Sequence, residues 1–99
     1  MAITTSQNEA EIVFHVSGRF DFTCSQLFEE LYRSIKENER DLVIDFQHTE
    51  YIDSSGIGLL LRMRHELGQH NHAIQIRNCD EPLMRQFRIS QFEQFFSFE

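Results

Sequence analysis

Apolar and polar positions along the chain form blocks whose spacing predicts secondary structure. Across residues 11–17 apolar side chains alternate with polar ones, which is the pattern of a strand with one buried face formed by Ile12, Phe14 and Val16. The apolar run over 42–46 predicts a second strand, and the alternation over 73–77 predicts a short third one. Residues 1–10 are polar and predict a lead-in with a weak edge strand.

Helical spacing of apolar residues appears in three further segments. The first helix is predicted over 25–38, with Thr23 as its N-cap. The second is predicted over 55–67 and ends at Gly68, with Ile57, Leu60 and Leu61 facing inward and Met63 on an outer face. The third starts at residues 80–82, and its apolar side is predicted to consist of Leu83, Met84, Phe87 and Ile89.

These elements alternate along the chain, and their order predicts an α/β fold. We expect a single domain over residues 1–99, with a mixed four- to five-stranded β-sheet and three to four α-helices packed mainly on one face. The tail contains Phe92, Phe95, Phe96 and Phe98. We expect it to pack over the sheet as a short final helix or strand, with an exposed recognition surface as the alternative.

Composition excludes several classes of protein. With 99 residues and a formal net charge of -7, the chain lacks the basic surface that non-specific nucleic-acid binding needs. No apolar run approaches the ~20 residues of a membrane helix, and residues 1–10 are too polar for a signal peptide. We therefore expect a cytoplasmic protein that does not bind a membrane. Cys24 and Cys79 show no CxxC spacing and are predicted to be reduced, buried thiols.

The segment Asp53-Ser54-Ser55-Gly56 carries the clearest functional signal. It follows the apolar strand and opens the second helix, so hydroxyl groups and free backbone N–H groups are predicted to meet at a helix N-terminus. Such a position accepts an anion, and phosphorylation can supply one to a serine there. The structural alternative is an ordinary helix cap.

Enzymatic and ligand-binding alternatives find less support in the sequence. A G-x-S-x-G nucleophile elbow is absent, and no base is placed beside Ser54, so we expect no enzyme activity. His65, His70 and His72 straddle a predicted helix end and read as surface residues, so no metal and no cofactor is expected. A phosphate- or nucleotide-binding module remains an alternative, although the Walker lysine and G-x-G-x-x-G loop are missing.

The layout around this segment resembles the STAS domain, and in particular the bacterial anti-sigma factor antagonists. The residues that carry the resemblance are Gly18-Arg19-Phe20-Asp21 before the first helix, and Asp45-Phe46 followed by Ile52-Asp53-Ser54-Ser55-Gly56-Ile57-Gly58. It covers the chain from about Glu11 to Phe98. Two positions differ from the family's pattern: Arg19 stands where a glutamate is common, and Gln91 lies where a glycine is usual.

The resemblance implies regulation by partner switching. The unmodified protein would bind an anti-sigma factor that is a GHKL-type serine kinase, the kinase would phosphorylate Ser54, and a PP2C-type phosphatase would reverse the modification. Asp21, Asp53, Ser55 and Gly56 are expected to line the site, and Met63 to contact the partner. A target outside sigma-factor control, such as a regulator of biofilm, motility or secretion, is the alternative. We expect a monomer, with a dimer as the other option.

Overall fold

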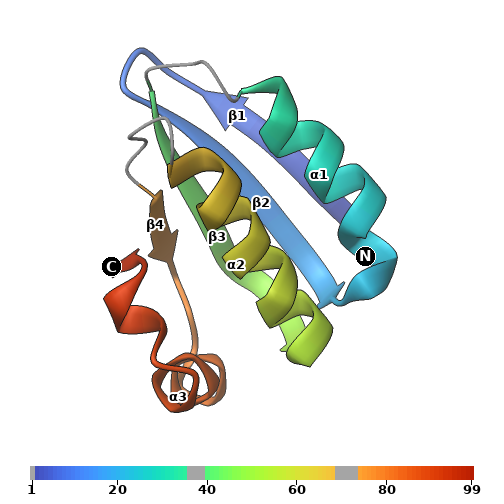
Figure 1. Ribbon diagram of the computed structural model, residues 1–99, viewed down its shortest axis with the longest axis vertical. Coiled ribbons are helices and arrows are strands. Elements are labelled where there is room, and N and C mark those ends of the chain that lie inside the picture. The colour runs from blue at the N-terminus through green and yellow to red at the C-terminus, as the bar shows by residue number, and fades with distance from the viewer. Residues whose placement is uncertain (1, 36–39, 69–73) are drawn as a thin grey trace.

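Five strands form the sheet of the computed structural model, in the order β1-β2-β3-β4-β5 (Figure 1). The structure describes residues 2–35, 40–68 and 74–99. Strand β1 runs antiparallel to β2, and the other neighbouring strands are parallel, so the sheet is mixed as predicted. The strands are β1 (Ala2–Gln7), β2 (Glu11–Phe20), β3 (Asp41–Ile52), β4 (Ile74–Arg77) and β5 (Ser97–Phe98).

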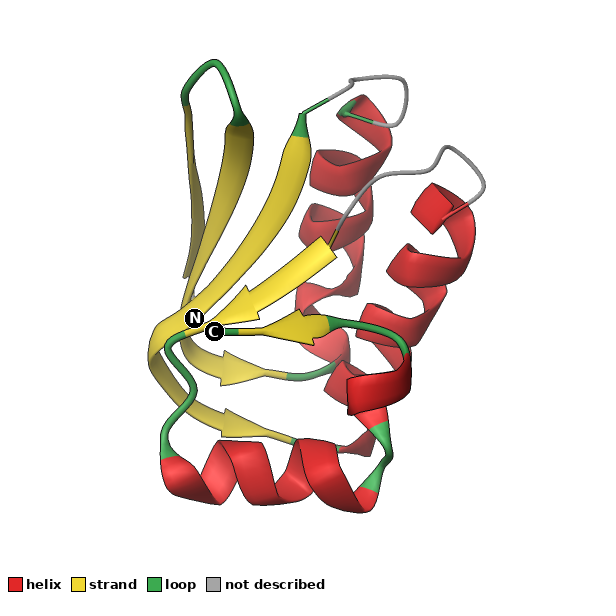
Figure 2. Cartoon of the chain, turned by 90° about the vertical axis from the view of Figure 1, so that its left-hand side faces the viewer, coloured by secondary structure: helices red, strands yellow, loops and turns green. Residues whose placement is uncertain are grey.

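Helices connect the parallel strands. Helix α1 (Ser25–Ser34) follows a short 3-10 helix, η1 (Phe22–Cys24), while α2 (Ser54–Gly68) follows β3 and α3 (Glu81–Ile89) follows β4. A second 3-10 helix, η2 (Phe92–Gln94), leads into β5. Helices α1 and α2 cover the same face of the sheet, and α3 lies across one end of it (Figure 2). None of the helices in the described ranges is long and apolar enough to cross a membrane.

The core lies between the sheet and helices α1 and α2. Ile12, Phe14 and Val16 of β2 are buried, which confirms the alternation predicted for this strand. Edge-to-face aromatic contacts link Phe14 and Phe20 to Phe28 of α1. Each such pair contributes about 0.5–1.5 kcal/mol beyond its buried area, so the aromatic contacts help to fix α1 on the sheet.

The rotation of α2 differs from the prediction. Met63 was expected on an outer face, but it is fully buried, whereas Leu61, expected to face inward, is 37% exposed. The inward stripe consists of Gly56, Leu59, Leu60, Met63 and Leu67. Gly56 sets this rotation, because a Cβ atom there would lie 2.3 Å from the backbone oxygen of Phe20. The helix therefore turns Gly56, which has no Cβ atom, toward the end of β2.

Other boundaries also differ from the sequence-based expectations. Strand β3 continues beyond Phe46 to Ile52, and the N-cap of η1 is Asp21, which accepts a hydrogen bond from the Thr23 amide. Ile89 was expected on the apolar side of α3 but is 78% exposed. The predicted start of the third helix at residues 80–82 is confirmed, since Asp80 caps α3 and Pro82 lies in its first turn.

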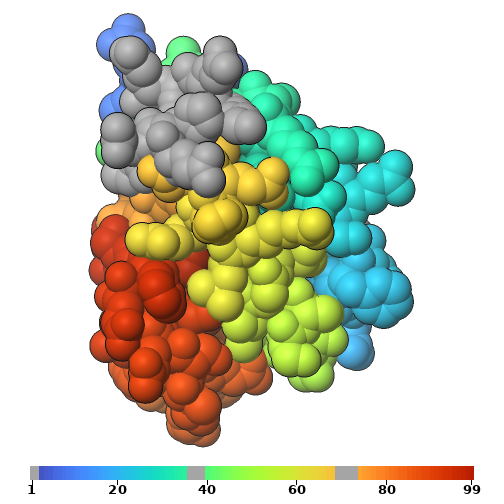
Figure 3. Space-filling model, viewed as in Figure 1, coloured from blue at the N-terminus to red at the C-terminus, as the bar shows by residue number. Residues whose placement is uncertain are grey.

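The tail follows the predicted packing for the most part. Phe92 and Phe96 are buried, and the ring of Phe87 stacks on Phe92 at 5.1 Å between centroids. Phe95 is 40% exposed. The tail lies beside α3 at one end of the molecule (Figure 3), where it closes the core and adds the edge strand β5.

Candidate functional site

The carboxyl ends of β2 and β3 bring together the two segments that the sequence analysis singled out. The parallel register pairs Arg19 with Tyr51 and Phe20 with Ile52. The chain then leaves β2 at Asp21 and leaves β3 at Asp53. Because parallel strands end at the same edge of a sheet, η1 and the start of α2 lie at one end of the molecule (Figure 1).

Asp53 is the N-cap of α2. Its Oδ1 accepts a hydrogen bond from the Gly56 amide at 3.0 Å, and its backbone oxygen accepts one from the Ile57 amide. The same Oδ1 accepts a hydrogen bond of 2.6 Å from the Ser55 hydroxyl. The hydrogen bond from Ser55, followed by the one from Gly56, holds the pKa of the Asp53 carboxyl below its ordinary value. The cap is therefore a carboxylate at neutral pH.

The two serines of the segment differ in their availability. Ser54 is the first residue of α2 and is exposed. Ser55 is half-buried, and its hydroxyl is engaged by Asp53. A modifying enzyme would reach the Ser54 hydroxyl at the surface, whereas the Ser55 hydroxyl would first have to leave the cap.

A second carboxylate lies beside the first. Asp21 accepts hydrogen bonds from both the hydroxyl and the amide of Thr23, and the hydroxyl bond holds its pKa below the ordinary value. The negative charge of Asp53 acts on Asp21 in the opposite direction. The Nε atom of Arg19 lies 3.7 Å from an oxygen of Asp21. The two aspartates and Arg19 therefore form one charged cluster at the start of α2.

Exposed apolar side chains surround this cluster. Tyr51 and Ile89 line an open groove of about 410 Å³ beside Ser54, between the end of β3, the start of α2 and helix α3. Tyr51 is 43% exposed, and Phe22, next to Asp21, is 70% exposed. Exposed aromatic and aliphatic side chains around a polar centre are typical of a protein–protein contact surface.

Most of the predicted site residues lie together in the structure, but two of them, Gly56 and Met63, are buried. Asp21, Asp53, Ser54 and Ser55 meet at the start of α2, but Gly56 is buried against β2 and supplies an amide to the cap instead of a surface. Met63 is buried in the core and cannot contact a partner.

Sequence reasoning missed Tyr51, Phe22 and Ile89 as members of the surface around Ser54. Tyr51 and Phe22 stand next to motif residues, and this adjacency was the available signal. Ile89 is distant in the sequence, so only the position of α3 reveals it.

A Ser-His-Asp chain also exists, but it does not involve Ser54. The Ser6 hydroxyl and His15 Nε2 are 2.9 Å apart, and His15 Nδ1 lies 2.9 Å from Asp45 Oδ2. Asp45 is buried and accepts further hydrogen bonds from the Asn78 side chain and the Gln47 amide. These bonds satisfy a buried carboxylate on the sheet, which is a structural role.

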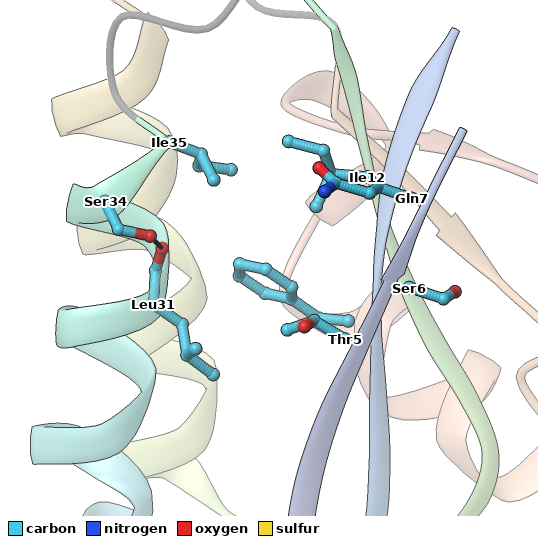
Figure 4. Close-up of a pocket in the computed structure, with 8 residues that line it drawn as sticks. Thr5, Ser6, Gln7, Ile12, Leu31, Ser34 and Ile35 are labelled. Atoms are coloured by element: carbon cyan, nitrogen blue, oxygen red, sulfur yellow. Dashed lines mark hydrogen bonds between the residues drawn. The ribbon is translucent and has the colours of Figure 1, made fainter. Parts of the chain in front are cut away.

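A separate cavity of about 260 Å³ lies between β1, β2 and α1 (Figure 4). Ile12, Leu31 and Ile35 point into it, whereas Ser6 points away. None of the described residues that line it has a charged side chain, so these residues offer no counter-charge to a nucleotide phosphate.

Metal binding was a further alternative. Of the three histidines considered for a metal site, His65 is exposed on α2, and His70 and His72 lie outside the described residues. Within the described ranges, His, Cys, Asp and Glu side chains form no group that could hold a metal ion.

Comparison with known proteins identifies the family. The model of the STAS domain matches residues 2–99. The chain is 37% identical over 98 residues to a STAS-domain containing protein of Pseudomonas aeruginosa (strain UCBPP-PA14), covering 97% of each protein. It is 25% identical over 88 residues to the anti-sigma-B factor antagonist of Bacillus subtilis (strain 168), covering 89% of this chain and 81% of that protein.

Solved structures share the fold at lower identity. The unphosphorylated anti-sigma factor antagonist SpoIIAA gives a TM-score of 0.77 at 18% identity, covering 99% of this chain and 87% of that one. A putative anti-sigma factor antagonist of Thermotoga maritima gives 0.85 at 10% identity, covering 97% and 84%. The matching family model and the relative in Pseudomonas aeruginosa agree with the architecture described above, and the chain belongs to the STAS domain family.

Proposed function

We propose that this protein is an anti-sigma factor antagonist that works by partner switching. In its unphosphorylated form it binds an anti-sigma factor that is a GHKL-type serine kinase. The kinase phosphorylates Ser54, the complex dissociates, and a PP2C-type phosphatase restores binding. The observation that carries the proposal is that Ser54 is an exposed residue at the first position of α2, whereas the hydroxyl of its neighbour Ser55 is already bonded to Asp53.

The surroundings of Ser54 support a role for phosphorylation in release. A phosphoserine adds about −1.5 to −2 charges beside the carboxylates of Asp53 and Asp21. A partner that packs on Tyr51 and Ile89 would then meet a charged, hydrated group at the edge of an apolar groove. Desolvating that group weakens binding, and each ~1.4 kcal/mol lost reduces the affinity tenfold.

The comparisons support the same class of role. Anti-sigma-B factor antagonists are among the relatives, and the Bacillus cell fate determinant SpoIIAA has been solved in a phosphorylated form with a TM-score of 0.76 to this chain. A regulator of biofilm, motility or secretion remains the alternative target. It requires the same site and differs only in what the partner controls.

The test combines phosphosite mapping with partner capture from the source organism. We expect mass spectrometry to find phosphate on Ser54 of the protein purified from cells, and to find none there in Ser54→Ala. Ser54→Ala used as bait should retain a serine kinase from cell extract, and a bait carrying phosphoserine at 54 should retain at least tenfold less of it. Phosphate solely on Ser55, or equal retention by both baits, would contradict the proposal.

A further inference from the structure

Arg19 is placed to act on the start of α2. It is the penultimate residue of β2 and pairs in register with Tyr51, two residues before Asp53. Its guanidinium lies over the Tyr51 ring at 4.6 Å from the centroid. Stacking on Tyr51 places the exposed side chain near Asp21 and Asp53. The pKa values of these carboxyls are lowered first by hydrogen bonds from Thr23 and Ser55, and the charge of Arg19 adds a smaller effect in the same direction.

The contact between Arg19 and Asp21 is weak, so the Arg19 guanidinium can leave Asp21 for another anion. The Nε atom of Arg19 is 3.7 Å from Asp21, which exceeds hydrogen-bond distance, and the Arg19 side chain is 64% exposed. Exposed ion pairs of this kind contribute little to stability. Asp21 meanwhile keeps its two hydrogen bonds from Thr23, so it does not depend on Arg19 for a partner. Arg19 can therefore turn to a stronger anion nearby.

Phosphorylation of Ser54 would create that anion at a helix start where the Gly56 and Ile57 amides are already bonded to Asp53. The Asp53 carboxylate already accepts hydrogen bonds from the Ser55 hydroxyl and the Gly56 amide. Arg19, Asp21 and Asp53 together carry a single net negative charge before modification, and a phosphate raises this by about 1.5 to 2. A cation within reach is needed to offset the repulsion, and a guanidinium fits a phosphate through two parallel hydrogen bonds.

We propose that Arg19 leaves Asp21 and binds the phosphate group of phosphorylated Ser54, so that the modified protein holds its own phosphate by an internal arginine–phosphate contact. This inference rests on the proposed modification of Ser54. Arg19 thereby acts as a positioning residue: it fixes the phosphate over the Tyr51 side of the groove. In the unmodified protein the same guanidinium remains beside Asp21.

The test places phosphoserine at position 54 during translation, so that no kinase is needed. The second pKa of the phosphate, about 6 for a free phosphoserine, is measured by ³¹P NMR titration in the otherwise unchanged protein, in Arg19→Gln and in Arg62→Gln. Arg62 is the matched control, since it is 62% exposed and paired with Glu29 on α1, eight residues after Ser54.

We expect Arg19→Gln to raise the phosphate pKa by about 0.5–1 unit, because a nearby cation favours the dianion. Arg62→Gln should leave it unchanged, and 1 M salt should remove most of the difference, since screening then acts within about 3 Å. Equal phosphate pKa values in all three proteins would overturn the inference. A shift in Arg19→Gln alone, with no phosphate found on Ser54 in cells, would uphold the contact and refute only the proposed function.

Discussion

Gly56 and Gly58 stand two residues apart in α2 and have opposite packing. A Cβ atom on Gly56 would lie 2.3 Å from the Phe20 oxygen and 2.9 Å from a side-chain carbon of Ile52, whereas one on Gly58 would meet nothing within 4 Å. We therefore expect Gly56→Ala to lower the free energy of unfolding by about 1–3 kcal/mol. Gly58→Ala should raise it by up to about 1 kcal/mol, since alanine favours the helix. Urea denaturation measures both, and equal midpoints would show that the approach of α2 to β2 is not tight.

The two thiols provide a second prediction for single residues. Burial, followed by the charges of Asp80 and Asp45, raises the pKa of Cys79 to about 12, and burial also raises the pKa of Cys24. Because only the thiolate reacts, we expect iodoacetamide at pH 8 to alkylate the native protein about a thousandfold more slowly than the denatured chain. The Cys24→Ala variant isolates Cys79 in the same assay. A native rate within tenfold of the denatured rate would contradict this prediction.

The face that α2 presents to the sheet can be tested with two neighbouring side chains. Met63 is fully buried and Leu61 is 37% exposed. We expect Met63→Ala to lower the free energy of unfolding by about 2–5 kcal/mol, the usual cost of emptying a core position. Leu61→Ala should cost well under half as much. Thermal unfolding gives the comparison, and a larger loss for Leu61→Ala would restore the rotation predicted from the sequence.

The rotation of α2 about its axis is the feature of the elements that the sequence did not predict. Strand β2 and the cap of α3 were predictable, because alternation and an Asp-Glu-Pro start are local patterns. In α2, four of the residues from 59 to 63 are apolar, so more than one face qualifies as the buried one. Gly56, Leu60, Met63 and Leu67 have helical spacing and form the face that is buried. The reason that this face is buried is the close approach of Gly56 to Phe20, which is a tertiary contact and cannot be recognised from the sequence.

The candidate site also has features that could be predicted from the sequence and features that could not. Asp53, Ser54 and Ser55 are consecutive, so the sequence could predict a capped helix start there. The different roles of the two serines depend on a single hydrogen bond of Ser55, and the groove beside Ser54 depends on where α3 crosses the end of the sheet. Neither follows from spacing along the chain.

Acid stability is a property of the whole molecule that the carboxylates should control. Burial opposes ionisation of Asp45, but the hydrogen bonds from Asn78, Gln47 and His15 outweigh it and hold its pKa below the ordinary value of 3.8. The unfolded chain therefore binds this proton at a higher pH than the folded protein does. The stability that Asp45 contributes is present above about pH 3.8 and is lost as the pH falls through the lower, folded value.

We expect the urea midpoint of the protein to fall as the pH drops from about 4 to about 2.5. Asp45→Asn should start from a lower midpoint at pH 6 and decline less over the same range, because the titrating group is gone. Asp41→Asn is a suitable control, since Asp41 is an exposed aspartate at the start of the same strand. If the profiles of Asp45→Asn and the unchanged protein run parallel, Asp45 does not contribute to acid stability.

The spacing of buried residues in β3 has a consequence for the engineering of the site. Residues 42–46 are all buried, but the next buried residues, Thr49 and Ile52, follow at intervals of three, and the register with β2 shifts twice over this stretch. The position of Tyr51 and Asp53 is therefore set by the number of residues between Phe46 and Ile52. A single insertion or deletion there would turn these side chains to the opposite face. Grafting this site onto another sheet would require the whole irregular segment as well as the motif Asp53-Ser54-Ser55-Gly56.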